Sequence, residues 1–132
     1  MLLTNQNLNS LYRWLAMPLH GEDARTRNKF VLATESTKDS IMKRREEILE
    51  SYCEKGEDGK AIIENGQYKL SEGKEEEAKK ELTTFLESDS GLALDRKMYK
   101  PIALVLEKNV KGAFSIEEGK EYYKIIDILE SL

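Results

Sequence analysis

The sequence predicts a mostly helical α+β domain in which a long central helix and one β-hairpin pack with N- and C-terminal helices. Apolar residues recur every three or four positions along most of the chain, which is the spacing of one helix face. The pair Asn65-Gly66 separates two short alternating segments, which is the strongest two-residue signal for a hairpin. The chain has 132 residues, 39% of them hydrophobic, which suffices for one domain with its own core.

We expect a single domain over residues 1–132. Its parts are a first helix and a break (1–22), a long helix (23–56), a hairpin (60–70) and a helical C-terminal half (71–132). The first helix is predicted over residues 5–19, with Thr4 or Asn5 as its N-cap. Pro18 comes late in this helix and should end or kink it.

The second helix is predicted over residues 24–54, from Asp23 as N-cap to a stop at Gly56. At 1.5 Å per residue it would be about 46 Å long, whereas a small domain is only about 30 Å wide. We therefore expect this helix to kink, to protrude or to pack against another molecule. The weakly apolar segment 33–38 is the expected place of a kink.

The hairpin register should place Ile63 opposite Tyr68 and Ala61 opposite Leu70. These four side chains form one apolar face, which needs a helix to cover it.

A third helix is predicted over residues 72–87, with Ser71 as its cap. Residues 92–110 fit either a buried strand or a helix with Pro101 in its first turn. The last helix should begin at the capping box Ser115–Glu118. Its apolar stripe is Tyr122, Ile125, Ile126, Leu129 and Leu132.

Several kinds of chemistry lack the residues they need. The chain has one Cys and one His, too few for a zinc site, and a Cys53–His20 dyad is less plausible than a buried Cys and a surface His. The loop 56–59 lacks the alternating acids of a calcium loop, and the Gly-Lys pairs at 59–60, 73–74 and 119–120 lack the P-loop spacing. We expect no catalytic residues, no metal, no cofactor and no small-molecule substrate.

The acidic residues of the long helix favour a solvated face over a paired-acid site. They are Glu46, Glu47, Glu50 and Glu54, and they follow three basic residues. A chain with one Cys forms no internal disulfide, which favours a reducing compartment. No apolar run approaches the length of a membrane span, and the start MLLTNQNLNS does not resemble a signal peptide.

Nucleic-acid binding is an alternative that the charge pattern raises. The net charge is −4, yet residues 13–45 hold eight basic and four acidic residues, a local charge of +4. The candidate phosphate contacts are Arg25, Arg27, Lys29, Lys43, Arg44 and Arg45. These residues are spread around the helix, the whole chain is acidic and no reading motif is present, so nucleic acid is the less favoured partner.

A protein contact through the long helix is the favoured hypothesis. Its candidate contact residues are Phe30, Ile41, Ile48 and Tyr52. If this stripe joins two copies, Ile41→Asp with Ile48→Asp should separate them without unfolding the domain. The alternative is that the hairpin and the terminal helices cover the stripe.

The order of several features in residues 5–70 resembles that of a known protein family. They are a leucine-rich helix, a break at Gly21, an Arg-Thr-Arg segment and the sequence EILESYCEKGEDGKAI before the hairpin. The residues concerned are Leu11, Leu15, Gly21, Arg25, Arg27, Phe30, Glu47, Leu49, Tyr52, Asp58, Gly59 and Tyr68. In these the chain resembles a family of small proteins of tailed bacteriophages and prophages of Gram-positive bacteria.

That family has no established activity, so the resemblance implies a context and no catalytic residues. It implies a protein made in the cytoplasm of an infected bacterium, with a place in the virion left open. Together with the residue pattern it favours an accessory or assembly protein that contacts a phage protein, a host protein or a second copy of itself.

Overall fold

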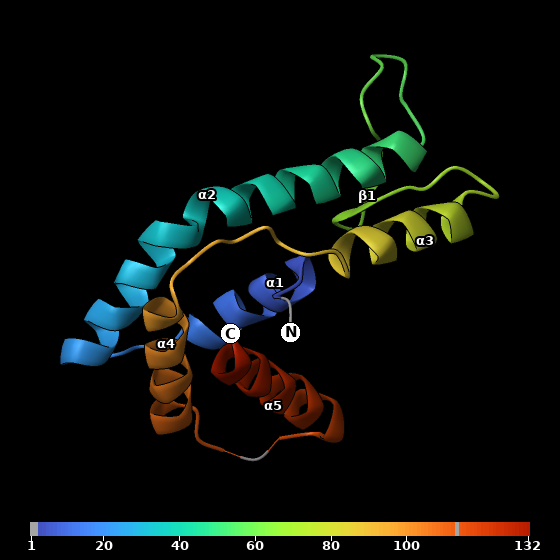
Figure 1. Cartoon of the computed structure of the whole chain (residues 1–132). Coiled ribbons are helices and arrows are strands. Elements are labelled where there is room, and N and C mark those ends of the chain that lie inside the picture. The colour runs from blue at the N-terminus through green and yellow to red at the C-terminus, as the bar shows by residue number, and fades with distance from the viewer. Residues whose placement is uncertain (1–2, 113) are drawn as a thin grey trace.

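The computed structural model describes residues 3–112 and 114–132, and in these residues the predicted mostly helical fold is confirmed (Figure 1). The elements are α1 (Asn5–Leu15), α2 (Gly21–Tyr52), β1 (Ile63–Glu64), β2 (Gln67–Tyr68), α3 (Glu75–Leu86), α4 (Arg96–Asn109) and α5 (Ile116–Ser131). The strands form one antiparallel hairpin.

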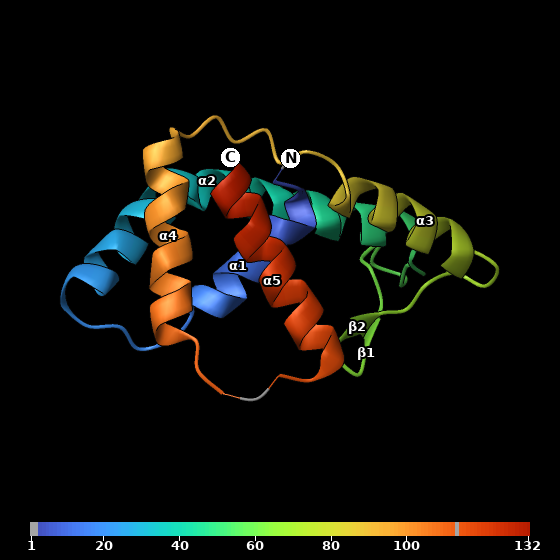
Figure 2. The same cartoon turned by 60° about the horizontal axis from the view of Figure 1, so that its bottom comes forward.

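One part of the molecule, which we call the body, is a helical bundle of α1, the first half of α2, α4 and α5 (Figure 2). Its fully buried side chains include Leu8, Leu11, Phe30, Ile102, Leu106, Ile125 and Leu129. A polar contact ties α1 to α2: the hydroxyls of Tyr12 and Thr34 lie 2.5 Å apart, and that of Thr34 donates to the carbonyl of Phe30. Helix α2 runs without a break through residues 33–38, and its axis bends between the part beside α4 and the part beside α3 (Figure 1).

The other part, which we call the arm, is residues 46–89: the end of α2, the hairpin and α3. Figures 1 and 2 show it projecting from the body. Ile48, Cys53 and Ala78 are buried in it but lie outside the core cluster of the body. The 32 residues of α2 span about 48 Å, which is longer than a small domain is wide. The helix can be this long because its first half packs in the body and its second half in the arm.

The predicted end of α1 and the predicted start of α2 are wrong, and at both places residues from distant parts of the chain make contact. Helix α1 ends at Leu15, where Arg27 of α2 donates to the carbonyls of Leu15 and Met17 at 3.2 and 2.5 Å. Helix α2 begins at Gly21, before Asp23, whose carboxylate instead accepts from Asn109 and pairs with Lys108 of α4. Hydrogen bonds from Asn109 and Lys108 hold the pKa of Asp23 below its usual value.

The end of α2, at Tyr52, precedes the predicted stop at Gly56 because the next residues join the hairpin. The backbone N–H of Glu54 donates to Lys69, and its carbonyl accepts from Ile62. The predicted pairing of Ile63 with Tyr68 is confirmed. The predicted pairing of Ala61 with Leu70 is wrong, since Ala61 bridges Lys55 and Leu70 bridges Cys53.

Residues 92–110, for which the sequence allowed a strand or a helix, contain helix α4. Helix α4 is capped by the side chain of Asp95, so Pro101 lies beyond the first turn, and residues 92–94 form no strand. Helix α3 begins at Glu75 after Lys74, so Ser71 is not its N-cap. The capping box of Ser115 and Glu118 at the start of α5 is confirmed. So is the buried stripe of Tyr122, Ile125, Ile126 and Leu129.

Candidate functional site: the groove of the arm

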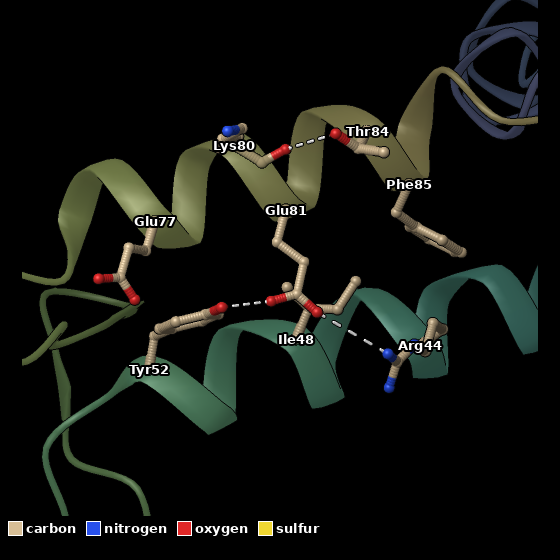
Figure 3. A pocket seen from close by; sticks show the side chains of 8 residues that line it. All are labelled: Arg44, Ile48, Tyr52, Glu77, Lys80, Glu81, Thr84 and Phe85. Carbon is tan, nitrogen blue, oxygen red and sulfur yellow. Dashed lines mark hydrogen bonds and ion pairs between the residues drawn. The ribbon is translucent and has the colours of Figure 1, made fainter.

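A groove of about 480 Å³ runs between the second half of α2 and α3, open to solvent (Figure 3). Its lining residues are Arg44, Ile48 and Tyr52 from α2, with Glu77, Lys80, Glu81, Thr84 and Phe85 from α3. Ile48, at 2% exposure, packs between the helices, whereas Lys80 and Thr84 are exposed along the outer edge. The groove therefore has an apolar floor and polar walls.

Glu81 connects the two walls of this groove. Its carboxylate accepts a hydrogen bond of 2.5 Å from the Tyr52 hydroxyl and lies 3.9 Å from the Arg44 guanidinium (Figure 3). Arg44 also lies 3.4 Å from Glu47. The hydrogen bond to Glu81 raises the pKa of Tyr52, and desolvation adds to this. These contacts hold α3 against α2.

A second hollow, of about 410 Å³, separates α2 from the hairpin. Tyr68 crosses it: its hydroxyl donates to Glu46 and lies 3.1 Å from Glu50. The hydrogen bond to Glu46, followed by desolvation and the contact with Glu50, raises the pKa of Tyr68. Glu46 and Glu50, which the sequence predicted to lie on a solvated face, thus hold the hairpin against α2 through Tyr68.

We expect the arm to lose stability as the pH rises above about 10, the ordinary pKa of tyrosine. Because the pKa values of Tyr52 and Tyr68 are raised, the folded chain holds these protons more tightly than the unfolded chain. The stabilisation is complete below pH about 10 and is lost as the pH rises through the raised values. Circular dichroism melts from about pH 8 to about pH 11 should show a smaller fall in Tm for Tyr68→Phe than for the unchanged chain.

The control for this titration is Tyr123→Phe, which removes a hydroxyl from an exposed ring on α5. Its Tm should fall with pH as steeply as that of the unchanged chain. Equal slopes in all three proteins would contradict the expectation.

The predicted contact stripe of α2 is divided between the core and this groove. Phe30 and Ile41, 1% and 5% exposed, belong to the core of the body. Ile48 and Tyr52 line the groove. Helices of its own chain cover Phe30, Ile41 and Ile48. The alternative named the hairpin and the terminal helices, whereas α3 packs on Ile48, and Tyr52 is half-buried in the open groove. Because Ile41 and Ile48 are buried, we expect Ile41→Asp with Ile48→Asp to unfold the domain rather than to separate two copies of it.

The six predicted phosphate contacts do not form one patch. Arg27 is bound to the end of α1, Arg44 to Glu47 and Glu81, and Arg45 lies 3.7 Å from Glu46. The other three, Arg25, Lys29 and Lys43, are exposed along α2.

The Cys53–His20 dyad does not form. His20 directly precedes α2 and Cys53 directly follows it, so about 48 Å of helix separates them. Among residues 3–112 and 114–132, no group of three or more His, Cys, Asp or Glu side chains is placed to hold a metal ion. In the same residues no helix has the length and apolar character to cross a membrane.

The α3 wall of the groove is the part that sequence reasoning missed. In the sequence, the spacing of Ala78, Leu82, Phe85 and Leu86 indicates which face of α3 is apolar. It carried no signal that this face packs on the second half of α2. A scan against protein-family models and searches of curated proteins and of solved structures each find no match to this chain.

Proposed function

We propose that this chain is a non-catalytic accessory or assembly protein of a tailed bacteriophage or prophage, and that it acts by protein–protein contact through the arm. The single observation that carries the contact surface is the open groove of the arm, which no other part of the described chain fills. The phage context, and with it the cytoplasm of an infected bacterium, rests on the resemblance in residues 5–70.

The charge distribution supports the arm as the contact element. Residues 46–89 hold 14 acidic and 6 basic residues, a net charge of −8. The remainder of the chain holds 11 acidic and 15 basic residues, a net charge of +4. A projecting part with a strong charge of one sign speeds encounter with a partner of opposite charge and helps to select it.

The chemistry of the groove favours binding over catalysis. Its central carboxylate, that of Glu81, is bonded to Tyr52 and faces Arg44. A general acid or base must lie within hydrogen-bond distance of the substrate proton that it transfers. The Glu81 carboxylate instead contacts Tyr52 and Arg44 and so links α3 to α2.

Site-directed photo-crosslinking in infected cells tests the proposal. A photoreactive residue at Thr84, on the exposed edge of the groove, should capture one phage or host protein, or a second copy of the chain. A matched residue at Glu35, exposed on the part of α2 that belongs to the body, should not capture it. The proposal fails if both positions give the same products, or if Thr84 gives none.

A further inference from the structure

The hairpin of β1 and β2 turns at Asn65 and Gly66, which form the only Asn-Gly pair in the chain (Figure 2). In such a pair the side-chain amide lies next to a backbone nitrogen that no Cβ shields, because glycine has none. Both residues are exposed, and a Cβ added at Gly66 would meet nothing within 4 Å. Solvent therefore reaches both the amide of Asn65 and the backbone nitrogen of Gly66.

No hydrogen bond holds either of these two groups. In the described part of the chain, the side chain of Asn65 has no hydrogen-bond partner, and the backbone N–H of Gly66 has no acceptor. A free N–H gives up its proton to hydroxide far more readily than one in a hydrogen-bonded helix or strand. The backbone nitrogen of Gly66 is thus accessible as a nucleophile.

The other five asparagines lack this combination of features. Each lies in a helix, where the backbone dihedral angles are fixed, and each precedes a residue that has a Cβ. Four of them also make side-chain hydrogen bonds. These helical asparagines are Asn5, Asn7 and Asn9 in α1, Asn28 in α2 and Asn109 in α4.

We propose that Asn65 is a site of spontaneous deamidation that releases the hairpin from α2. After hydroxide takes its proton, the Gly66 nitrogen forms a bond to Cγ of Asn65. The bond from Cγ to Nδ2 breaks, and Nδ2 takes a proton from water and leaves as ammonia. Water then opens the resulting cyclic imide. Opening at Cγ gives aspartate, and opening at the backbone carbonyl gives isoaspartate. The net reaction consumes water and releases ammonia, with no change of oxidation state.

The folded turn slows this reaction without preventing it. Asn65 has a φ of 51° and Gly66 a φ of 75°, as a type I′ turn requires. Ring closure needs a different backbone angle at Asn65, so the hairpin has to open first. Opening costs little free energy, because the two strands have only two residues each and are exposed or half-buried.

The two products differ in their effect on the hairpin. Aspartate suits the same turn, because Asp-Gly is also a preferred type I′ pair. Isoaspartate adds the side-chain methylene to the backbone, so the strands lose the register that places Ile63 opposite Tyr68. The Tyr68 hydroxyl then leaves its position beside Glu46 and Glu50. This slow, one-way step is independent of the contact proposed for the groove, which Asn65 does not line.

Peptide mapping by tandem mass spectrometry tests the reaction on the full chain, aged in warm and mildly alkaline buffer. The peptide with Asn65 should gain the mass of an amide-to-acid conversion at least about tenfold faster than any peptide with a helical asparagine, because the helices open less often than the hairpin. The rate should rise in proportion to the hydroxide concentration. Isoaspartyl methyltransferase should then label this peptide from S-adenosylmethionine. The proposal is overturned if Asn65 keeps its amide as long as the helical asparagines do.

Two variants connect the rate of deamidation to the opening of the hairpin. Tyr68→Phe removes the hydroxyl that holds the hairpin against α2, and it should speed the loss of the Asn65 amide about threefold or more. Tyr123→Phe removes an exposed hydroxyl on α5 and should leave the rate unchanged. In guanidinium all three chains should react at one common, faster rate, because no turn then holds Asn65. Equal rates in buffer for Tyr68→Phe and the unchanged chain would contradict the opening step.

Hydrogen exchange of the aged chain measures the effect on the arm. In the isoaspartate fraction, separated by ion exchange, amide protection over residues 60–70 should fall while that of α4 and α5 stays unchanged. Asn65→Gly places a Gly-Gly pair in the turn, which suits it equally, and should show no such change with age. Unchanged protection of the hairpin in the isoaspartate fraction would overturn its proposed release from α2.

Discussion

Ile41→Asp is expected to unfold most of the protein at room temperature. Ile41 is 5% exposed and belongs to the core of the body. Truncating such a side chain costs about 2–5 kcal/mol, and a buried carboxylate without a partner costs several more. Because a domain of this size is stable by only about 5–15 kcal/mol, little or no stability should remain.

Chemical denaturation followed by circular dichroism measures this effect. The matched control is Lys43→Asp, two residues further along α2, where the side chain is exposed. Its free energy of unfolding should stay within about 0.5 kcal/mol of that of the unchanged chain. A folded, soluble Ile41→Asp protein with near-native stability would show that α2 does not pack on the body as described.

Ile48 lies about two helical turns after Ile41 on α2, and Ile48→Ala should have a different consequence. Ile48 is 2% exposed, yet it packs between α2 and α3 and lies outside the core cluster of the body. Its truncation should cost about 2–4 kcal/mol through the lost contacts and the cavity left behind. We expect this cost to fall mainly on the arm, where Ile48 packs. The end of α3 is also held to the body, because Phe85 packs against the core cluster and Asn5 donates to the carbonyls of Phe85 and Ser88.

Hydrogen exchange followed by mass spectrometry separates local from global opening. Amide protection in α3 should fall roughly 30- to 1000-fold in Ile48→Ala, since each 1.4 kcal/mol is about tenfold, while protection in α4 and α5 stays unchanged. As a control, Ile102→Ala in the body should lower protection in α4 and α5. An equal loss throughout the chain in Ile48→Ala would mean that body and arm open as one unit.

Local signals in the sequence predicted the local features of the fold. The capping box at Ser115 and Glu118 and the pairing of Ile63 with Tyr68 depend on residues a few positions apart, and both are present. The helix boundaries depend on remote residues. Arg27 reaches back to end α1, and Asp23 faces α4 instead of capping α2. No nearby pattern encodes such contacts, so boundary prediction failed there.

The candidate site was predictable only on its α2 side. The apolar spacing identified Ile48 and Tyr52, but it joined them to Phe30 and Ile41 as one surface. Periodicity shows which face of a helix is apolar, but it does not show whether one or several other helices pack on that face. The contribution of Glu81 and Phe85 depends on how α3 folds back along α2, which follows from the tertiary structure.

Sharing one helix between body and arm has a mechanical consequence. A load applied to the groove reaches the bundle along a rod, because a hydrogen-bonded helix stretches little. From Ile41 to Tyr52 this rod extends about 16 Å past the last residue of the core that it carries. A tilt of about 5° where α2 crosses the bundle would displace the far end by about 1.5 Å, the amplitude of helix shifts that switch other proteins. The arm has a second attachment at the end of α3, where Asn5 donates to the carbonyls of Phe85 and Ser88, so the same tilt would also strain these two hydrogen bonds.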